Sequence, residues 1–219
     1  MKLAVLASGR GSNLAAILEA IDAGRLEGSV AAVIADRDAP ALERARARGL
    51  PAEQVPFRKA DRAAWDADLA EAVAAHAPDV VVLAGFMRIL GERFLKHFPK
   101  RILNVHPSLL PAFPGARAPQ AAIDAGVRLS GCTVHLVDAG VDTGPILAQA
   151  AVPVLPGDDA DRLHARIQAV EHRLLPAVLD AIGRGQLDLS THQWTGPLGD
   201  ADARAALLAP PGLAERAPA

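Results

Sequence analysis

Two polar side chains interrupt a short apolar run between residues 101 and 111. Asn104 and His106 are two residues apart, so in a β-strand the amide and the imidazole project from the same face. A second apolar run leads into the acidic, glycine-rich segment 137–144, which could bring Asp142 to the same place. Acyl transfer needs an oxyanion donor, a group titrating near neutrality and a carboxylate that orients it. For an isolated Asn-x-His pair, backbone hydrogen bonding at a strand end is the alternative.

Residues 8–13 form a polar, glycine-containing turn that indicates an anion site. The turn follows an apolar stretch, residues 2–7, and precedes an apolar period typical of a helix. Backbone N–H groups and the helix N-terminus would attract an anion, and Ser12 or Asn13 could hold that anion or cap the helix. The turn lacks a P-loop lysine, and Leu14 stands where a dinucleotide fingerprint has its third glycine. A single phosphate is the expected ligand, and a capped turn without a ligand is the alternative.

The positioning elements alternate between buried strands and amphipathic helices. Strands are expected at 2–7, 29–35, 52–55, 79–84 and 101–106, and helices at 14–21, 39–48 and 60–76. This order predicts an α/β, doubly wound, mainly parallel sheet with helices on both faces and ligands at the carboxyl ends of the strands. A helix at 118–125 and an antiparallel pair at 129–138 and 146–152 form the C-terminal edge, followed by a helix at 158–182. Residues 1–190 are expected to form one domain, and 191–219 a poorly ordered tail.

Composition and charge argue against a nucleic-acid-binding, secreted or membrane-spanning protein. The chain has 219 residues, 51% of them hydrophobic, and a net charge of −2, which gives no electrostatic footprint for nucleic acid. Cys132 is the single cysteine and suits a buried small residue in a reducing compartment. The sequence shows no secretory leader and no uncharged apolar stretch long enough to span a membrane, so a cytoplasmic location is expected.

The segment 158–182 carries four side chains of possible chemical interest: His164, Gln168, Glu171 and His172. Their spacing matches no HExxH or comparable metal motif, so no metal is expected. From the residues alone, a solvated helix face is the default interpretation of this set.

Taken together, five motifs in one order resemble the phosphoribosylglycinamide formyltransferase family, folate-dependent enzymes of purine synthesis also called glycinamide ribonucleotide transformylases. The motifs are Ser-Gly-Arg-Gly-Ser-Asn at 8–13, Ala-Gly-Phe-Met-Arg-Ile-Leu at 84–90, Leu-Asn-Val-His-Pro-Ser-Leu-Leu-Pro at 103–111, the segment 137–144, and Gln-Ala-Val-Glu-His at 168–172. They span residues 1 to about 190. The resemblance implies a formyltransferase fold with a Rossmann-like N-terminal half that binds glycinamide ribonucleotide and a C-terminal half that binds 10-formyltetrahydrofolate.

By motif position, the resemblance implies three groups of site residues. The catalytic set would be Asn104, His106 and Asp142. The ribonucleotide phosphate would be held by Gly11, Ser12 and Asn13, and its ribose contacted by Glu171 with Gln168 nearby. The folate would be bound, largely through backbone, by Arg62, Met87, Arg88, Ile89, Leu90, Val137, Asp138, Ala139, Gly140 and Val141. Arg117 departs from the family pattern, which commonly has histidine at that position, and the departure concerns local loop contacts rather than the three catalytic residues.

The resemblance further implies formyl transfer from 10-formyltetrahydrofolate, as co-substrate, to the primary amine of glycinamide ribonucleotide without a metal. The expected partners are these two small molecules, with no nucleic acid or membrane, and the expected state is a monomer or weak homodimer. Two related activities share the Asn-His-Asp set. A formyltetrahydrofolate deformylase is expected to carry a further N-terminal domain, and a methionyl-tRNA formyltransferase a C-terminal nucleic-acid-binding domain. A non-catalytic nucleotide-binding module is the alternative from another class.

Overall fold

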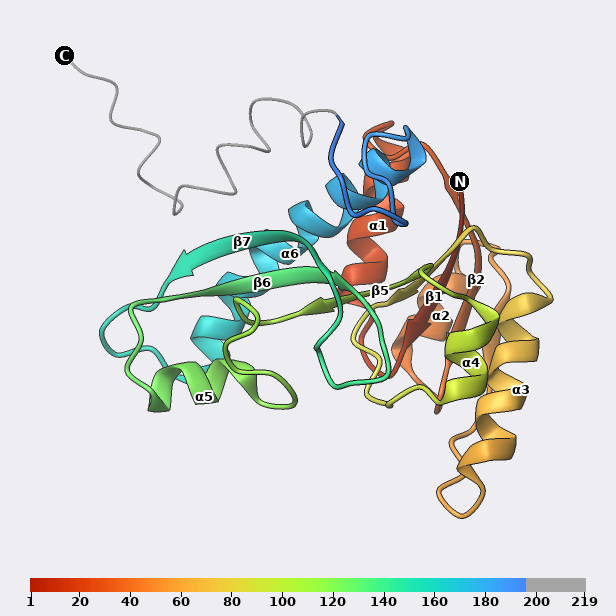
Figure 1. Cartoon of the computed structure of the whole chain (residues 1–219), viewed down its shortest axis with the longest axis horizontal. Coiled ribbons are helices and arrows are strands. Elements are labelled where there is room, and N and C mark those ends of the chain that lie inside the picture. The colour runs from red at the N-terminus through yellow and green to blue at the C-terminus, as the bar shows by residue number, and fades with distance from the viewer. Residues whose placement is uncertain (196–219) are drawn as a thin grey trace.

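One mixed sheet organises the fold of residues 1–195, the part of the chain that this computed structural model describes (Figure 1). Its seven strands have the order β3-β2-β1-β4-β5-β6-β7. The first five in the chain pair in parallel: β1 (Lys2–Ala7), β2 (Ser29–Ala35), β3 (Ala52–Gln54), β4 (Val80–Leu83) and β5 (Ile102–His106). The antiparallel edge consists of β6 (Leu129–Leu136) and β7 (Ile146–Pro153). The expected doubly wound sheet with an antiparallel C-terminal edge is confirmed.

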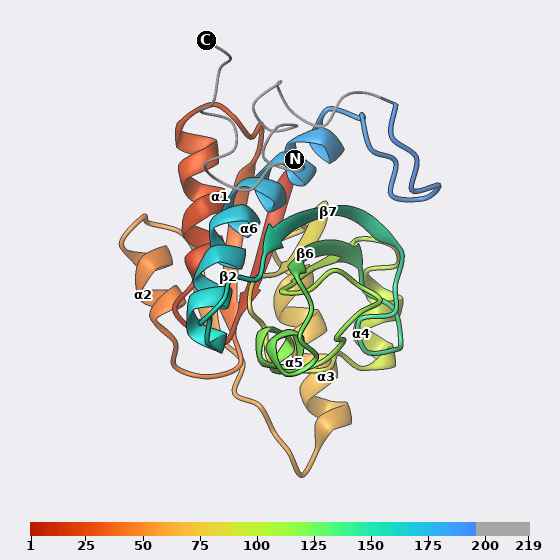
Figure 2. The ribbon, with the colours of Figure 1, turned by 90° about the vertical axis from the view of Figure 1, so that its left-hand side faces the viewer.

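Helices cover both faces of this sheet. The helices are α1 (Ser12–Asp22), α2 (Pro40–Arg46), α3 (Arg62–Ala74), α4 (Glu92–His97), α5 (Ala118–Asp124) and α6 (Ala160–Gly183). Figures 1 and 2 show α1 and α6 lying side by side on one face, with α3 and α4 on the other. Among residues 1–195, none of these helices is both long enough and apolar enough to cross a membrane.

Strand β1 shows why the sheet is buried on both faces. Leu3 and Val5 pack in the core under α1 and α6, whereas Ala4 and Leu6 pack in the core under α3 and α4. Alternate side chains of a strand point to opposite faces, so a continuous apolar run produces two cores. Cys132 on β6 is fully buried in the first core, as its sequence context predicts, and burial raises the pKa of its thiol.

The chain beyond α6 returns to the sheet. Trp194 forms an isolated antiparallel bridge with Leu187, and its indole N–H donates to the Leu147 carbonyl at 3.0 Å. The Lys100 ammonium donates to the Ser190 carbonyl at 3.3 Å. The first residues of the segment expected as a tail, 191–195, therefore pack on the domain. The rest of that expectation, residues 196–219, lies outside the described residues.

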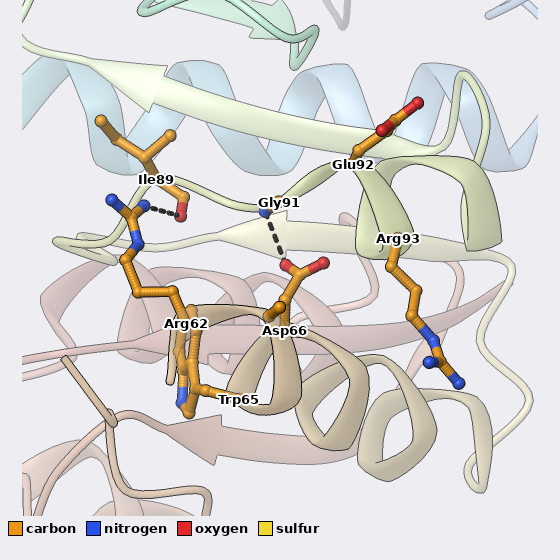
Figure 3. A pocket seen from close by; sticks show the side chains of 8 residues that line it. Arg62, Trp65, Asp66, Ile89, Gly91, Glu92 and Arg93 are labelled. Carbon is orange, nitrogen blue, oxygen red and sulfur yellow. Dashed lines mark hydrogen bonds between the residues drawn. The ribbon is translucent and has the colours of Figure 1, made fainter. Parts of the chain in front are cut away.

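A buried carboxylate joins α3 to α4. Asp66 accepts hydrogen bonds from the backbone N–H of Gly91 at 2.6 Å and of Phe94 at 2.9 Å. Figure 3 shows the hydrogen bond between the Gly91 N–H and the Asp66 carboxylate. Gly91 is the N-cap of α4 and has no side chain to satisfy the first N–H groups, so Asp66 caps this helix from its neighbour.

We expect Asp66→Ala to lower the free energy of unfolding by about 2–4 kcal/mol, because two backbone donors lose their acceptor. Urea unfolding followed by circular dichroism measures this change. The control is Asp68→Ala on the same helix, where an exposed carboxylate pairs with Arg58, and its effect should stay below about 1 kcal/mol. Equal effects of the two substitutions would contradict the capping role of Asp66.

Candidate active site

The three residues expected to act together do converge. Asn104 and His106 lie at the carboxyl end of β5. The Asn104 amide nitrogen is 3.3 Å from Asp142 Oδ1, and His106 Nδ1 is 3.2 Å from Asp142 Oδ2. His106 Nε2 lies 2.9 Å from the Phe113 carbonyl, and the Gly115 N–H donates to Asp142 Oδ2 at 2.7 Å. The Asp142 carboxylate thus joins β5 to the two loops that follow β5 and β6.

Local hydrogen bonds shape the loop that delivers Asp142. Asp138 Oδ1 accepts from the Gly140 N–H at 3.0 Å and from the Thr143 hydroxyl at 2.7 Å. A Cβ at Gly144 would lie 1.9 Å from the Leu136 carbonyl oxygen, so only glycine allows the loop to close. Asp142 itself has φ of 55°, a left-handed conformation that costs energy for a non-glycine residue and is held here by its side-chain partners.

His135 is a member of this cluster that the sequence interpretation missed. It lies directly opposite Asn104 in the antiparallel β5–β6 ladder. Its Nε2 is 3.1 Å from the Asn104 amide nitrogen and 3.6 Å from Asp142 Oδ1, and its Nδ1 is 2.8 Å from the Leu136 carbonyl. Pairing the two apolar runs in register would have revealed it, because residues opposite each other in a ladder share a face.

Proton positions follow from these partners. Both ring nitrogens of His106 face oxygen acceptors, the Phe113 carbonyl and the Asp142 carboxylate, so the imidazolium satisfies both contacts. His135 Nδ1 faces the Leu136 carbonyl and therefore carries a proton, and Nε2 lies near both the Asn104 amide nitrogen and Asp142 Oδ1. Contact with His135, the Gly115 N–H and the charge of His106 hold the pKa of Asp142 at about 2 despite burial. The carboxylate is ionised at neutral pH.

The turn expected to bind phosphate precedes α1. Gly11 is the N-cap of α1 with φ of 72°, and a Cβ there would lie 2.9 Å from the Ala41 Cβ, so the position requires glycine. Within residues 1–195, no side chain caps the helix, and Ser12 is its first residue. The interpretation of Ser12 or Asn13 as the cap is wrong, because a left-handed residue already occupies the N-cap.

Asn13 and Glu171 meet in the interior between α1 and α6. The Asn13 amide nitrogen donates to Glu171 Oε2 at 3.2 Å, and both side chains are buried. The default interpretation of Glu171 as a solvated-face residue is wrong, since the helix face that carries it packs against α1 (Figure 2). Gln168, one turn earlier on α6, is half-buried. Burial raises the pKa of Glu171 to about 7, against the lowering effect of the Asn13 hydrogen bond.

Along the segment 85–90, exposed side chains alternate with buried or half-buried ones. Met87 and Ile89 are 70% and 56% exposed, whereas Leu90 is buried against the core under α3 and α4. The Arg88 side chain turns inward, and its Nε lies 2.6 Å from the buried Asp36 carboxylate. A folate bound at this segment would therefore meet the backbone and the two exposed apolar side chains, with the Arg88 guanidinium engaged elsewhere.

A pocket of about 450 Å³ adjoins this segment between α3 and the start of α4 (Figure 3). The guanidinium of Arg62 donates to the Ile89 carbonyl at 3.4 Å at one end of the pocket, and Arg93 lies at the other. Trp65 and Asp66 form part of its wall. The expected folate residues Arg62 and Ile89 are therefore brought together.

The remaining folate candidates lie in the Asp142 loop. Val137 packs against the core, whereas Asp138, Ala139, Gly140 and Val141 are exposed. Arg117 is also exposed and is the N-cap of α5 with φ of 65°. In the described part of the chain, no group of three or more His, Cys, Asp or Glu side chains is arranged to hold a metal ion.

This chain is similar in sequence to known proteins over most of its length. The family model described as formyl transferase matches residues 1–179. A phosphoribosylglycinamide formyltransferase of Mycobacterium tuberculosis (strain CDC 1551 / Oshkosh) is 53% identical over 184 residues, which cover 83% of this chain and 84% of that protein. The chain belongs to the phosphoribosylglycinamide formyltransferase family.

Solved structures of formyltransferases share the fold. Glycinamide ribonucleotide transformylase 1 from Symbiobacterium toebii is 50% identical, with a TM-score of 0.83 over 86% of this chain and 90% of that one. A formyltetrahydrofolate deformylase from Pseudomonas syringae pv. tomato is 30% identical, with a TM-score of 0.79, but only 63% of that chain is covered. The family, the fold and the formyltransferase class expected from the five motifs are confirmed.

The raised pKa of Glu171 predicts a pH-dependent stability term. The unfolded carboxyl ionises near 4.5 and the folded one near 7, so folding retains a proton between these values and stability falls as pH rises through them. Relative to Glu171→Gln, the wild-type free energy of unfolding should fall by up to about 3 kcal/mol between pH 4.5 and 7. Urea unfolding across this range measures the difference. The control is Glu43→Gln, at an exposed position on α2, which should not reproduce this fall of about 3 kcal/mol, because the desolvation that acts on Glu171 requires burial.

Proposed function

We propose that this chain transfers the formyl group of 10-formyltetrahydrofolate to the primary amine of glycinamide ribonucleotide. The observation that carries the proposal is the convergence of Asn104, His106 and Asp142 at the carboxyl edge of the sheet. The amine nitrogen bonds to the formyl carbon, the bond from that carbon to the folate nitrogen breaks, and the amine proton passes to that nitrogen. This reaction calls on no metal and no redox cofactor. A cytoplasmic monomer or weak homodimer fits such small-molecule chemistry.

His106 and Asn104 would stabilise the tetrahedral oxyanion. Their N–H groups now bond acceptors within the protein, so each must exchange a partner when substrate binds. An oxyanion is a stronger acceptor than the Phe113 carbonyl, and the 3.3 Å bond from Asn104 to Asp142 is already long. The donors therefore move toward the substrate as negative charge develops, which is when their stabilisation lowers the barrier.

Asp142 would favour the imidazolium of His106 and move the proton between the two nitrogens, directly or through water. Its ionised state suits an acceptor, because the pKa of about 2 leaves the carboxylate unprotonated before the reaction. His135 would hold the Asn104 amide and the Asp142 carboxylate in place from the opposite strand.

The two substrates would occupy opposite sides of this set. Gly11, Ser12 and Asn13 would hold the ribonucleotide phosphate, with Glu171 and Gln168 on its ribose. The folate would lie against Arg62, the segment 87–90 and the loop 137–141. The supporting observations are the hydrogen bond of Asn13 to Glu171, the bond of Arg62 to the Ile89 carbonyl and the exposure of Met87 and Ile89.

The decisive measurement is tetrahydrofolate formation from 10-formyltetrahydrofolate by purified protein, with and without glycinamide ribonucleotide. We expect formation only with the ribonucleotide, and loss of formation in Asn104→Ala and His106→Ala. Equal formation without the ribonucleotide would make water the acceptor and the protein a deformylase. No formation by folded protein would leave a nucleotide-binding module.

We expect Asp142→Asn to lower kcat by about 10²- to 10⁴-fold, because the substitution removes the charge that favours the imidazolium and the group that relays the proton. The KM for the ribonucleotide should be retained, since its expected contacts lie on α1 and α6. Steady-state kinetics measure both constants. Asp124→Asn, at an exposed position on α5, is the matched control and should behave as wild type. Near-normal turnover of Asp142→Asn would remove Asp142 from the mechanism.

A further inference from the structure

A second buried carboxylate lies at the same edge of the sheet and belongs to neither substrate group. Asp36 follows β2 directly, and its side chain is fully buried. Two arginines bind it: Arg88 Nε at 2.6 Å and Arg37 Nη2 at 2.9 Å from Oδ2. Arg37 lies on the exposed side, whereas Arg88 comes from the segment 85–90. Asp36 therefore fixes, from within, the segment expected to receive the folate.

Ser8 extends this attachment to the end of β1. The Ser8 hydroxyl bonds the Asp36 carboxylate and accepts the Met87 N–H at 2.9 Å. The Ser8 N–H in turn donates to the Gly85 carbonyl at 3.2 Å. Two neighbouring residues of the segment, Met87 and Arg88, are thus tied to one carboxylate, one through its backbone and the other through its side chain.

The aromatic ring of Phe57 also contacts the Arg88 guanidinium. The guanidinium carbon lies 4.0 Å from the centroid of the Phe57 ring, a cation–π distance. Phe57 packs edge-on against Trp65 at 4.9 Å, and its backbone N–H donates to the Asp36 carbonyl. With Arg88 held inward, the alternation of the segment turns Met87 and Ile89 outward.

Ionisation of Asp36 maintains this arrangement. Burial acts to raise the pKa of Asp36, but hydrogen bonds from Arg37, Ser8 and Arg88 outweigh it, and the pKa lies below its usual value. A charged acceptor forms stronger hydrogen bonds to guanidinium than a neutral one, so loss of the charge loosens the segment rather than a single contact.

We propose that Asp36 is a positioning residue for the folate: through Arg88 and Ser8 it holds the backbone of residues 87–90 in the shape that receives this substrate. This inference rests on the proposed function and adds to it a residue that makes no contact with either substrate. It explains why the Arg88 side chain is turned away from the surface although its neighbours are exposed.

The test measures binding, with no need for turnover. In Asp36→Asn, we expect the Kd for tetrahydrofolate, measured by isothermal titration calorimetry, to rise about 10- to 100-fold, the scale of loss when a hydrogen bond to a charged group is lost. The Kd for glycinamide ribonucleotide should not change, because an asparagine oxygen still accepts the Ser8 hydroxyl. Retained ribonucleotide binding also shows that the variant is folded.

Two further variants make the test specific. Asp38→Asn neutralises an exposed carboxylate two residues further along the same loop and leaves the arginines on Asp36 in place, so it should bind tetrahydrofolate as wild type. Arg88→Lys leaves Asp36 paired with a cation but loses the planar group over Phe57, and should weaken tetrahydrofolate binding even if Asp36→Asn does not fold. Wild-type affinity in Arg88→Lys or in folded Asp36→Asn, or an equal loss in Asp38→Asn, would overturn the proposal. Failure of the wild-type protein to bind tetrahydrofolate would instead overturn the proposed function on which it rests.

Discussion

Burial of the sheet on both faces is the constraint on which the site depends. A charged group within the strands would lose its hydration without gaining a partner, so polar chemistry is confined to the strand ends and the loops beyond them. Ser8 and Asp36 follow β1 and β2, and Asn104 and His106 lie at the end of β5. Because these strands are parallel, their ends meet at one edge, and groups far apart in the chain become neighbours.

Two carboxylates at this edge of the sheet are kept ionised by hydrogen-bond donors, but the donors differ in kind. Asp142 and Asp36 are both held ionised by donors that outweigh burial. The donors around Asp142 include titratable imidazoles, so its charge is coupled to groups that can exchange protons. Those around Asp36 are guanidinium groups and a hydroxyl, which hold their protons throughout the physiological range. The first arrangement suits chemistry, and the second suits a fixed backbone.

Glu171 illustrates the opposite balance. Its bond from Asn13 is a neutral amide contact, so burial dominates and the pKa rises to about 7. The two carboxyl groups therefore differ electrostatically: Asp142 keeps its charge across neutral pH, whereas Glu171, between α1 and α6, changes charge near pH 7. Packing of α6 against α1 creates this difference, because it removes water from a residue that a solvated helix would leave ordinary.

The sequence by itself determined the order of the elements, the two-faced burial of the strands and the placing of Asn104 and His106 on one strand face, since apolar periodicity and strand alternation are local properties. Asp142 was added as a candidate by the order of the motifs. Only the tertiary structure decided the rest. His135 lies beside Asn104 because of the register of β5 with β6. Glu171 is buried by a helix some 150 residues away in the chain. Arg88 turns inward because its guanidinium binds the Asp36 carboxylate and packs on the Phe57 ring. These are contacts between distant segments, and they depend on how elements pack, which no local pattern records.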